Sequence, residues 1–204
     1  YYYESDPTLL TKRIEKITKY DRRKQNLADE IKRVEESDEF NKEKIIENLE
    51  KKDTLGKVNF DSVIISAFDE TLKSITTSLI YTDVTPKKTY FITLNQWFDE
   101  SLLNEDSSQN LYFPSINKKN FDEFKKEYFK KYSSEPNQIS LLGFDLVGLI
   151  FYLSKANDFQ FNNEVFGKKN TFKGKIGIFE IEDKRIKHVL NFYKVENNKF
   201  KKIF

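Results

Sequence analysis

The chain has 204 residues, which is enough for one large domain or two small lobes with a buried core. Charged residues make up 33% of the sequence, but a 15% share of aromatic residues excludes a disordered chain. The formal net charge of +2 favours neither a nucleic acid nor a membrane surface as partner. Because cysteine is absent, disulfides, iron–sulfur clusters and cysteine-ligated zinc are excluded.

The first three residues are tyrosines, which is typical of the end of a strand. Asp6-Pro7 predicts a helix start, since Asp6 can accept from the first free amides and proline suits the first helical position. From Leu10 to Val34, apolar residues recur at spacings of three or four, which predicts a long helical arm with one apolar stripe. We expect a bend in the hydrophilic stretch 21–26.

Ser37-Asp38 is a second cap signal, and the residues from Phe40 to Leu49 predict a further helix. The apolar spacing is not sustained over three or four clean heptads, so we expect the arm to pack on a sheet rather than to form a coiled coil.

The stretch from Phe60 to Trp97 organises the rest of the chain. It contains the apolar run Val63-Ile64-Ile65, a helix-period segment from Glu70 to Tyr81, and a second apolar run from Tyr90 to Leu94. This order predicts a parallel β-α-β unit.

Ligands or partners of an open parallel sheet meet the loops at the carboxyl ends of its strands. The first loop holds Ser66, Ala67, Phe68 and Asp69, and the second holds Asn95, Gln96 and Trp97. Trp97 can be a half-buried packing residue or a stacking residue that faces a cleft.

A polar, acidic loop is expected over residues 99–110, followed by a short strand Leu111-Tyr112-Phe113 that stops at Pro114. Residues 117–132 predict a helix with aromatic residues on one side. Residues 139–156 predict the most apolar helix of the chain, which we expect to be almost completely covered. Its longest apolar stretch is far shorter than the roughly 20 residues of a membrane span.

The last part of the chain predicts strands. Alternation from Ile186 to Tyr193 indicates one strand with both faces partly covered. Asn197-Asn198 is a candidate hairpin turn, and residues 200–204 form a lysine-rich edge strand, which discourages edge pairing.

The sequence contains little catalytic equipment. His188 is the only histidine, and we expect it to be structural. The glycines of Lys173-Gly174-Lys175-Ile176-Gly177 precede a strand rather than a helix, which does not favour phosphate binding. Acidic pairs at Asp69-Glu70 and Asp99-Glu100 precede helical patterns and are typical of helix starts. We therefore expect a protein that is not an enzyme and that uses no cofactor or metal.

Several short motifs resemble, in their order, the second half of a type I periplasmic-binding-protein fold. They are Phe60 to Ile65, Tyr112-Phe113-Pro114-Ser115, the 124–132 helix followed by Ser134-Glu135-Pro136, Gly143-Phe144-Asp145, and Phe172-x-Gly174-x-x-Gly177. The opening arm, with Tyr20-Asp21-Arg22-Arg23-Lys24, is similar to the penicillin-binding-protein activators, which are LppC-like lipoproteins.

The resemblance implies an α/β fold: a Rossmann-like parallel sheet flanked by helices, with a C-terminal β hairpin. It assigns residues 1–115, including the helical arm 6–52, mainly to the second lobe. Residues 116–170 become a helical return segment of the first lobe, and residues 171–204 a C-terminal β segment. Compared with a complete member, the chain lacks the first β-α-β lobe and the lipid-attachment cysteine. It also opens without a methionine, so we expect a fragment or trimmed product.

In function, the resemblance implies a non-enzymatic periplasmic regulator that stimulates a penicillin-binding protein, a peptidoglycan synthase, by protein contact. A lipid anchor outside this chain would tether it to the outer membrane. The alternative is a solute-binding protein of an ABC transporter for amino acids or similar small polar ligands. The resemblance places residues 66–69 and 95–97 on one cleft wall and Tyr112 near a crossing strand, and it gives Asp145 a role in capping or anchoring a helix.

Overall fold

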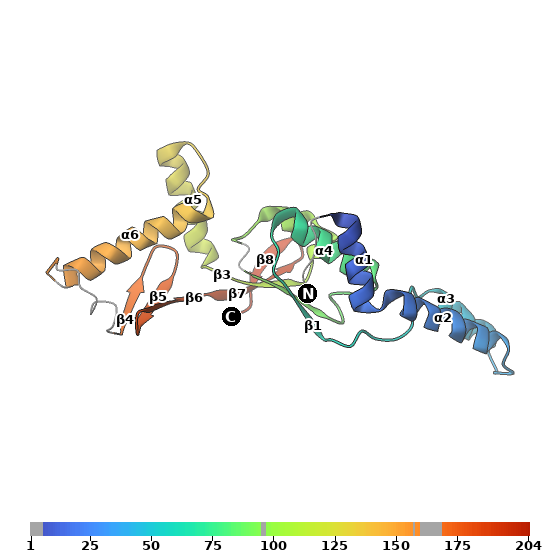
Figure 1. The fold of residues 1–204 in the computed structure, drawn as a ribbon. Helices are drawn as coiled ribbons and strands as arrows, with labels where there is room; N and C mark the ends of the chain where they lie inside the picture. Colours follow the sequence, from blue (N-terminus) through green and yellow to red (C-terminus); the bar gives the residue numbers. More distant parts are fainter. Residues whose placement is uncertain (1–5, 95–96, 157, 160–168) are drawn as a thin grey trace. The chain divides into compact units, whose positions relative to one another are not determined.

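The computed structural model describes residues 6–94, 97–156, 158–159 and 169–204, without the side chains of residues 138 and 139. The strand end predicted at residues 1–3 lies outside these ranges. The helices are α1 (Pro7–Thr18), α2 (Tyr20–Glu35), α3 (Lys42–Glu50), α4 (Asp69–Tyr81), α5 (Lys118–Tyr132) and α6 (Gln138–Ala156), with 3-10 turns η1 (Glu100–Asn104) and η2 (Asp106–Ser108) (Figure 1). The strands are β1 (Ser62–Ile65), β2 (Tyr90–Thr93), β3 (Leu111–Ser115), β4 (Asn170–Lys173), β5 (Ile178–Glu182), β6 (Arg185–Val189), β7 (Asn191–Glu196) and β8 (Lys199–Lys202).

The chain divides into two compact units. Unit 1 comprises residues 1–94, 99–112 and 195–199, and unit 2 comprises residues 95–98, 113–194 and 200–204. One sheet has the strand order β1-β2-β3-β7-β8, and a second has the order β4-β5-β6. Among the described residues, no helix combines the length and apolarity needed to cross a membrane.

The predicted β-α-β unit is present in unit 1. Strands β1 and β2 pair in parallel with Ser62 opposite Tyr90 and Ile65 opposite Thr93, and α4 connects them. Strand β3 continues the parallel arrangement, with Ile92 opposite Tyr112. Helix α4 buries Leu72 and Leu79 on its inner side. The predicted strands, the helix between them and their parallel direction are therefore confirmed.

The helical arm breaks at Lys19, and the bend predicted at residues 21–26 is wrong. Lys19 adopts a left-handed conformation with φ 53°, which ends α1 and starts α2. The hydrophilic stretch lies inside α2 because polar side chains on a solvated helix face do not interrupt its backbone hydrogen bonds. At the start of α1, the predicted cap is present: Asp6 accepts from the backbone amides of Thr8 and Leu9.

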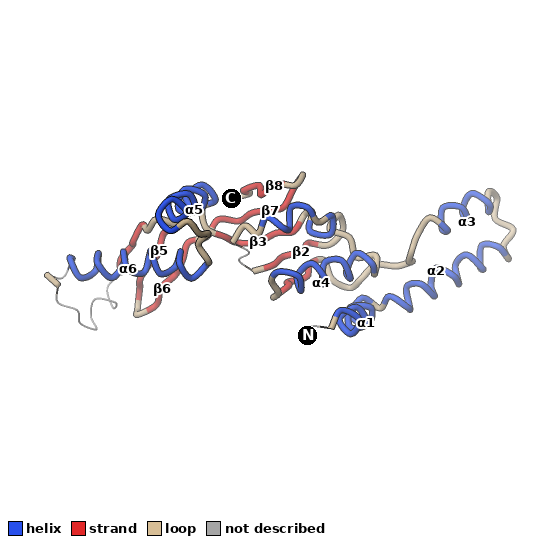
Figure 2. Tube along the Cα trace, turned by 90° about the horizontal axis from the view of Figure 1, so that it is seen from above, coloured by secondary structure: helices blue, strands red, loops and turns tan. Residues whose placement is uncertain are grey.

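The three arm helices pack in different ways. Helix α1 lies beside α4, where the hydroxyls of Thr11 and Ser78 are 3.0 Å apart. Helices α2 and α3 instead run side by side (Figure 2), around a cluster formed by Leu27, Val34 and Leu49. Helix α1 thus packs on α4, and α2 and α3 cover one another, so the predicted packing of the arm on a sheet is wrong for α2 and α3.

Helix α3 begins later than its predicted cap. Its N-terminal neighbour is Asn41, with φ 73°, and the side chain of Asn41 makes no capping hydrogen bond. Phe40 precedes the helix and is 91% exposed, so it does not belong to the apolar stripe.

The segment between β2 and α5 differs from its prediction in two respects. The expected loop 99–110 contains η1 and η2, and β3 continues through Pro114 to Ser115. The pairing of β3 with β2 involves Leu111 and Tyr112, so Pro114 lies beyond it and its missing N–H removes no hydrogen bond from that pairing.

In unit 2, α5 begins as predicted. The side chain of Asn117 accepts from the backbone amide of Asn120. Of the predicted aromatic stripe, Phe124 is buried, whereas Phe129 is 52% exposed.

Helix α6 contradicts the expectation that it is almost completely covered. Its inner side buries Leu141, Asp145, Leu149 and Leu153, and seven large apolar side chains elsewhere on the helix are at least 43% exposed. An apolar sequence indicates that burial of the helix is favourable, but it does not show that another surface is present to cover it.

The C-terminal strands are shorter than predicted. The alternation from Ile186 to Tyr193 is divided at Leu190 into β6 and β7, and β6 pairs antiparallel with β5. Asn197 and Asn198, both with positive φ, join β7 to β8 as a hairpin turn. Strand β8 is the lysine-rich edge of its sheet, as predicted.

Candidate functional site

The carboxyl ends of β1 and β2 lie together in unit 1. The hydroxyl of Thr93, the last residue of β2, donates to the carbonyl of Ile65 at 3.0 Å and contacts the carbonyl of Ala67 at 3.5 Å. This holds the loop that contains Ser66 and Ala67 against the end of β2. Ala67 is buried, whereas Phe68 is 46% exposed.

Asp69 and Glu70 occupy the first turn of α4, the role expected of an acidic pair before a helix. Asp69 has a positive φ of 51°. Glu70 accepts from the ammonium of Lys73 at 2.8 Å, and this hydrogen bond raises the pKa of Lys73. The Glu70 carboxylate is thus engaged by a neighbour on its own helix.

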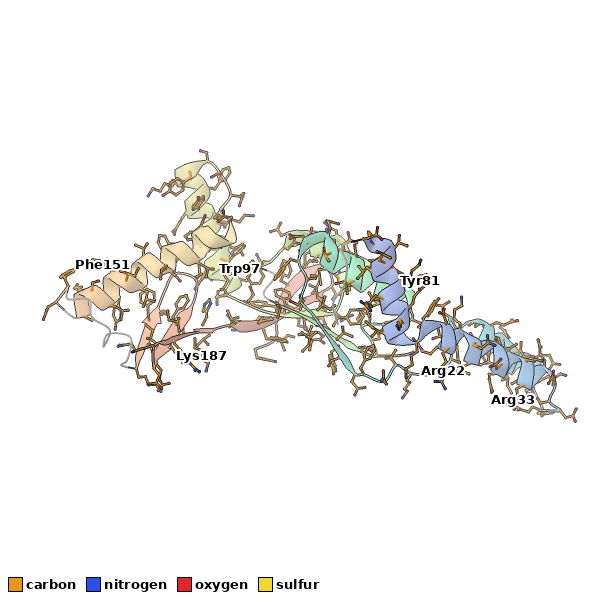
Figure 3. All side chains as sticks on the ribbon, viewed as in Figure 1. Arg22, Arg33, Tyr81, Trp97, Phe151 and Lys187 are labelled. Atoms are coloured by element: carbon orange, nitrogen blue, oxygen red, sulfur yellow. The ribbon has the colours of Figure 1, made fainter. Side chains whose placement is uncertain are left out.

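The second predicted loop is described only in part. Asn95 and Gln96 lie outside the described residues. Trp97 (Figure 3) is partly buried, has φ 50° and belongs to unit 2. The grouping of residues 95–97 with residues 66–69 on one cleft wall stays a prediction.

Tyr112 lies within β3, opposite Ile92. Its ring meets the ring of Tyr90 edge to face, with centroids 5.7 Å apart. Because Tyr90 is the first residue of β2, this contact lies toward the amino end of that strand, away from the loop at residues 66–69.

Tyr90 and Tyr112 identify a surface that sequence reasoning missed. Side chains alternate between the two faces of a sheet, and the register places Ser62, Ile64, Tyr90, Ile92 and Tyr112 on one face. We call these five residues the open face. Ile64 is 72% exposed and Tyr90 is 59% exposed, so no helix covers them.

The opposite face of the same strands is the one covered by helices. Val63 and Ile65 belong to it, and Ile65 and Phe91 are buried. The two apolar runs are continuous and so indicated strands covered on both sides. The only sequence signals for an open face were the serine at position 62 and the tyrosines at 90 and 112, whose hydroxyls favour a partly wet surface.

An apolar groove lies on the covered side, at the edge of β1. It has a volume of about 400 Å³ and is lined by Leu10, Ile14 and Ile17 of α1, Ile75 and Leu79 of α4, and residues of β1. Among the described residues of the lining, Arg13 is the one with a charged side chain. The groove can bind an apolar group, and the guanidinium of Arg13 can bind an anion.

In unit 2, Asp145 and the glycine turn form a structural cluster. Both carboxylate oxygens accept backbone amides of the turn between β4 and β5, from Lys175 at 2.7 Å and Ile176 at 3.0 Å. The amides that could have bound a phosphate are therefore occupied. Asp145 joins the middle of α6 to a β turn, so of the two roles expected for it, capping a helix is wrong and anchoring a helix agrees with the structure.

His188 stacks on Phe179, with ring centroids 4.3 Å apart and an angle of 15° between the rings. Burial lowers the pKa of His188, and the nearby Asp145 charge opposes that shift. The Nε2 atom is buried without a hydrogen-bond partner among the described residues. In that part of the chain, no three or more His, Asp or Glu side chains gather where they could hold a metal ion.

No sequence family and no curated protein matches the chain. Solved structures do. An extracellular ligand-binding receptor from Desulfohalobium retbaense DSM5692 matches with a TM-score of 0.51 and 16% identity over 70% of this chain and 26% of that chain. A putative branched-chain amino acid ABC transporter protein from Rhodospirillum rubrum matches with a TM-score of 0.58 and 12% identity over 79% of this chain and 48% of that chain.

Full-length LpoA from Haemophilus influenzae also matches, with a TM-score of 0.41 and 14% identity over 78% of this chain and 28% of that chain. The chain thus spans a quarter to a half of the length of these structures. At such identities the likeness concerns the fold alone. The chain has an α/β fold similar to periplasmic-binding-protein-like folds, with a sheet whose strands β1, β2 and β3 are parallel, helices packed against it and a C-terminal hairpin.

Proposed function

We propose that this chain is a non-enzymatic periplasmic regulator that stimulates a penicillin-binding protein, a peptidoglycan synthase, by direct protein contact. A lipid anchor outside this chain would hold it at the outer membrane. The order of the sequence motifs and the tyrosine- and arginine-containing arm support this choice within a fold that many ligand receptors share.

The open face is the observation that carries the proposal. Ile64 and Tyr90 are exposed and Tyr112 is partly buried, and these apolar and aromatic side chains lie next to one another on three adjacent strands. Exposed patches of this composition are typical of protein–protein contacts, in which tyrosine supplies much of the binding energy. A flat sheet face suits a protein better than it suits a small molecule, which requires a concave site.

The test is binding and activity with a purified penicillin-binding protein from the same organism. We expect the chain to bind it and to increase its rate of glycan synthesis. Tyr90→Asp should weaken binding at least about tenfold, because it places a charge in the centre of the contact. Tyr132→Asp is the matched control, since Tyr132 is 55% exposed on α5 of the other unit. Trp97→Ala should have no effect.

Equal binding by Tyr90→Asp and Tyr132→Asp would exclude the open face as the contact. Absence of any binding, with circular dichroism showing intact folds, would remove the regulatory function itself.

A solute-binding function is the second candidate, and the groove at β1 favours it. A volume of about 400 Å³ suits a small ligand, and its aliphatic lining with Arg13 suits a molecule with a carboxylate and an apolar side chain. Among the described residues that line the groove, none carries a carboxylate that could accept from an ammonium group. Calorimetric titration with individual amino acids distinguishes the two candidate functions. Micromolar affinity for an amino acid that is lost in Arg13→Gln would support the solute-binding function.

A further inference from the structure

Helix α6 leaves an apolar surface uncovered in unit 2. Its exposed large side chains are between 43% and 68% accessible and comprise Leu142, Phe144, Leu146, Val147, Ile150, Phe151 and Tyr152. The helix has only two charged residues, the buried Asp145 and Lys155 near its end. Tyr152 packs on Phe172 of β4, and Leu142 also lies toward the buried side of the helix, which leaves Phe144, Leu146, Val147, Ile150 and Phe151 on the outer side. An exposed apolar surface of this kind marks a contact with another macromolecule.

The two sides of α6 have different neighbours. On the inner side, Leu149 and Leu153 pack with Ile181 and Phe172 of the β4-β5-β6 sheet. Phe151, labelled in Figure 3, is 61% exposed and belongs to the outer side.

The outer side carries a seam of four residues at spacings of four, three and four: Gly143, Val147, Ile150 and Ser154. Such spacing places them along one line of the helix, as in the contact seam of paired helices. Leu146 and Phe151 flank this seam on its two sides. A Cβ atom built on Gly143 meets nothing within 4 Å, so the seam is open to an incoming helix.

The seam is complementary to itself when a second copy of α6 runs antiparallel to it. With a two-fold axis at the level of residues 148 and 149, Val147 lies opposite Ile150 of the second copy, and Gly143 lies opposite Ser154 of the second copy. Val147 and Ile150 of both copies then fill the centre of the contact. Near each end, the small residues Gly143 and Ser154 leave room for the flanking ring of Phe151 from the other helix.

The absence of charge favours a second copy as the occupant, and the area fits a weak pair. Charged residues make up 33% of the chain, but the seam and its flanks carry none, so an identical face leaves no charge unpaired. Five outer side chains that are about half exposed offer roughly 450 Å² per copy, if a full large side chain is taken as about 150–200 Å². This amounts to about 900 Å² in a pair, the size of a weak interface.

We propose that the outer side of α6 pairs antiparallel with the same side of a second copy of this chain, forming a weak two-fold dimer. The proposal does not depend on the proposed function, because its test involves no penicillin-binding protein and no solute.

Sedimentation equilibrium of the 204-residue chain should show reversible dimers between about 1 and 200 µM. Val147→Glu should raise the dissociation constant at least about thirtyfold, because the pair would bury two like charges. Val189→Glu is the matched control, since Val189 is 42% exposed on β6 of the same unit, and it should leave the dimer intact. Circular dichroism establishes that both variants are folded.

Because the chain has no cysteine, crosslinking can test the register. Mixed Val147→Cys and Ile150→Cys chains should form the 147–150 disulfide faster than either variant crosslinks with itself. Crosslinking mainly between identical positions would overturn the antiparallel arrangement. A chain that stays monomeric at about 200 µM, or a dimer that Val147→Glu does not weaken, would overturn the proposal.

Discussion

The Asp145 carboxylate accepts the backbone amide of Ile176 at 3.0 Å and joins the middle of α6 to the turn between β4 and β5. The other carboxylate oxygen accepts the amide of Lys175 at 2.7 Å. Asp145 is only 2% exposed, so these two bonds replace its hydration. A Cβ atom on Gly174 would collide with this carboxylate, which explains the glycine at that position.

We expect Asp145→Asn to lower the free energy of unfolding of unit 2 by about 2–3 kcal/mol, because one buried amide then faces an NH₂ donor instead of an acceptor. Urea unfolding followed by circular dichroism measures the change. Asp183→Asn is the control, since Asp183 is exposed in the β5–β6 turn and asparagine tolerates its positive φ of 49°. Equal stability of the two variants would contradict a stabilising role for the Asp145 bonds.

Arg23 connects three segments of unit 1. Its guanidinium donates to the carbonyl of Thr82 at 3.0 Å and to the hydroxyl of Thr54 at 2.7 Å. The carboxylate of Asp83 accepts from Thr54 at 2.6 Å and lies 3.4 Å from Arg23. We expect Arg23→Lys to cost about 2–3 kcal/mol of unfolding free energy, because an ammonium group cannot reproduce the planar fork.

The neighbouring Arg22 gives a matched control. It is exposed on α2 (Figure 3), so Arg22→Lys should change the unfolding free energy by less than about 0.5 kcal/mol. Urea midpoints of both variants, measured at the same ionic strength, test the difference. If the two substitutions had the same effect, the Arg23 contacts would be excluded as a source of stability.

Phe98 lies at the centre of an aromatic cluster in unit 2. Its ring contacts the ring of Tyr193 edge to face, with centroids 4.8 Å apart, and also meets the rings of Phe113, Phe121 and Phe200. Phe98 is only 3% exposed. Phe98→Ala should therefore cost about 3–4 kcal/mol through the cavity it leaves, whereas Phe40→Ala, at a 91% exposed position, should cost almost nothing in the same urea titration.

Local sequence patterns correctly predicted those strands, helices and caps that depend on residues close together in the sequence. The alternation of apolar runs and a helical segment predicted β1, α4 and β2, and parallel pairing followed because a helix connects strands that point the same way. Asp6 was recognised as a cap because a cap acts on amides within three residues of itself.

Sequence patterns failed where the outcome depends on distant partners. Arg23 sits in a hydrophilic stretch but is buried, since its acceptors are 31 to 60 residues away. The exposure of the open face at Ile64 and of the outer side of α6 was not predicted, for a related reason. Hydrophobicity indicates that a residue favours burial, but the surface that covers it must come from another part of the structure.

His188 makes the stability of unit 2 depend on pH. Burial lowers the pKa of His188 below its unfolded value of about 6.5, so the unfolded chain binds the proton more tightly. The stability contribution is then complete above about pH 7 and is lost as the pH falls from the unfolded pKa through the lower folded pKa, by at most about 1.4 kcal/mol per pH unit. Because His188 is the only histidine, one imidazole resonance in an NMR titration gives its folded pKa directly.

Urea midpoints at pH 7.5 and 5.5 test this dependence. The urea midpoint of the wild type should be lower at pH 5.5 than at pH 7.5. The midpoint of His188→Gln should change less between these pH values, because glutamine does not titrate and the imidazole that takes up the proton is removed. An unchanged pH dependence in His188→Gln would assign the effect to carboxylates instead. An NMR midpoint above about 6.5 would show that the Asp145 charge outweighs burial, and the predicted direction would then be reversed.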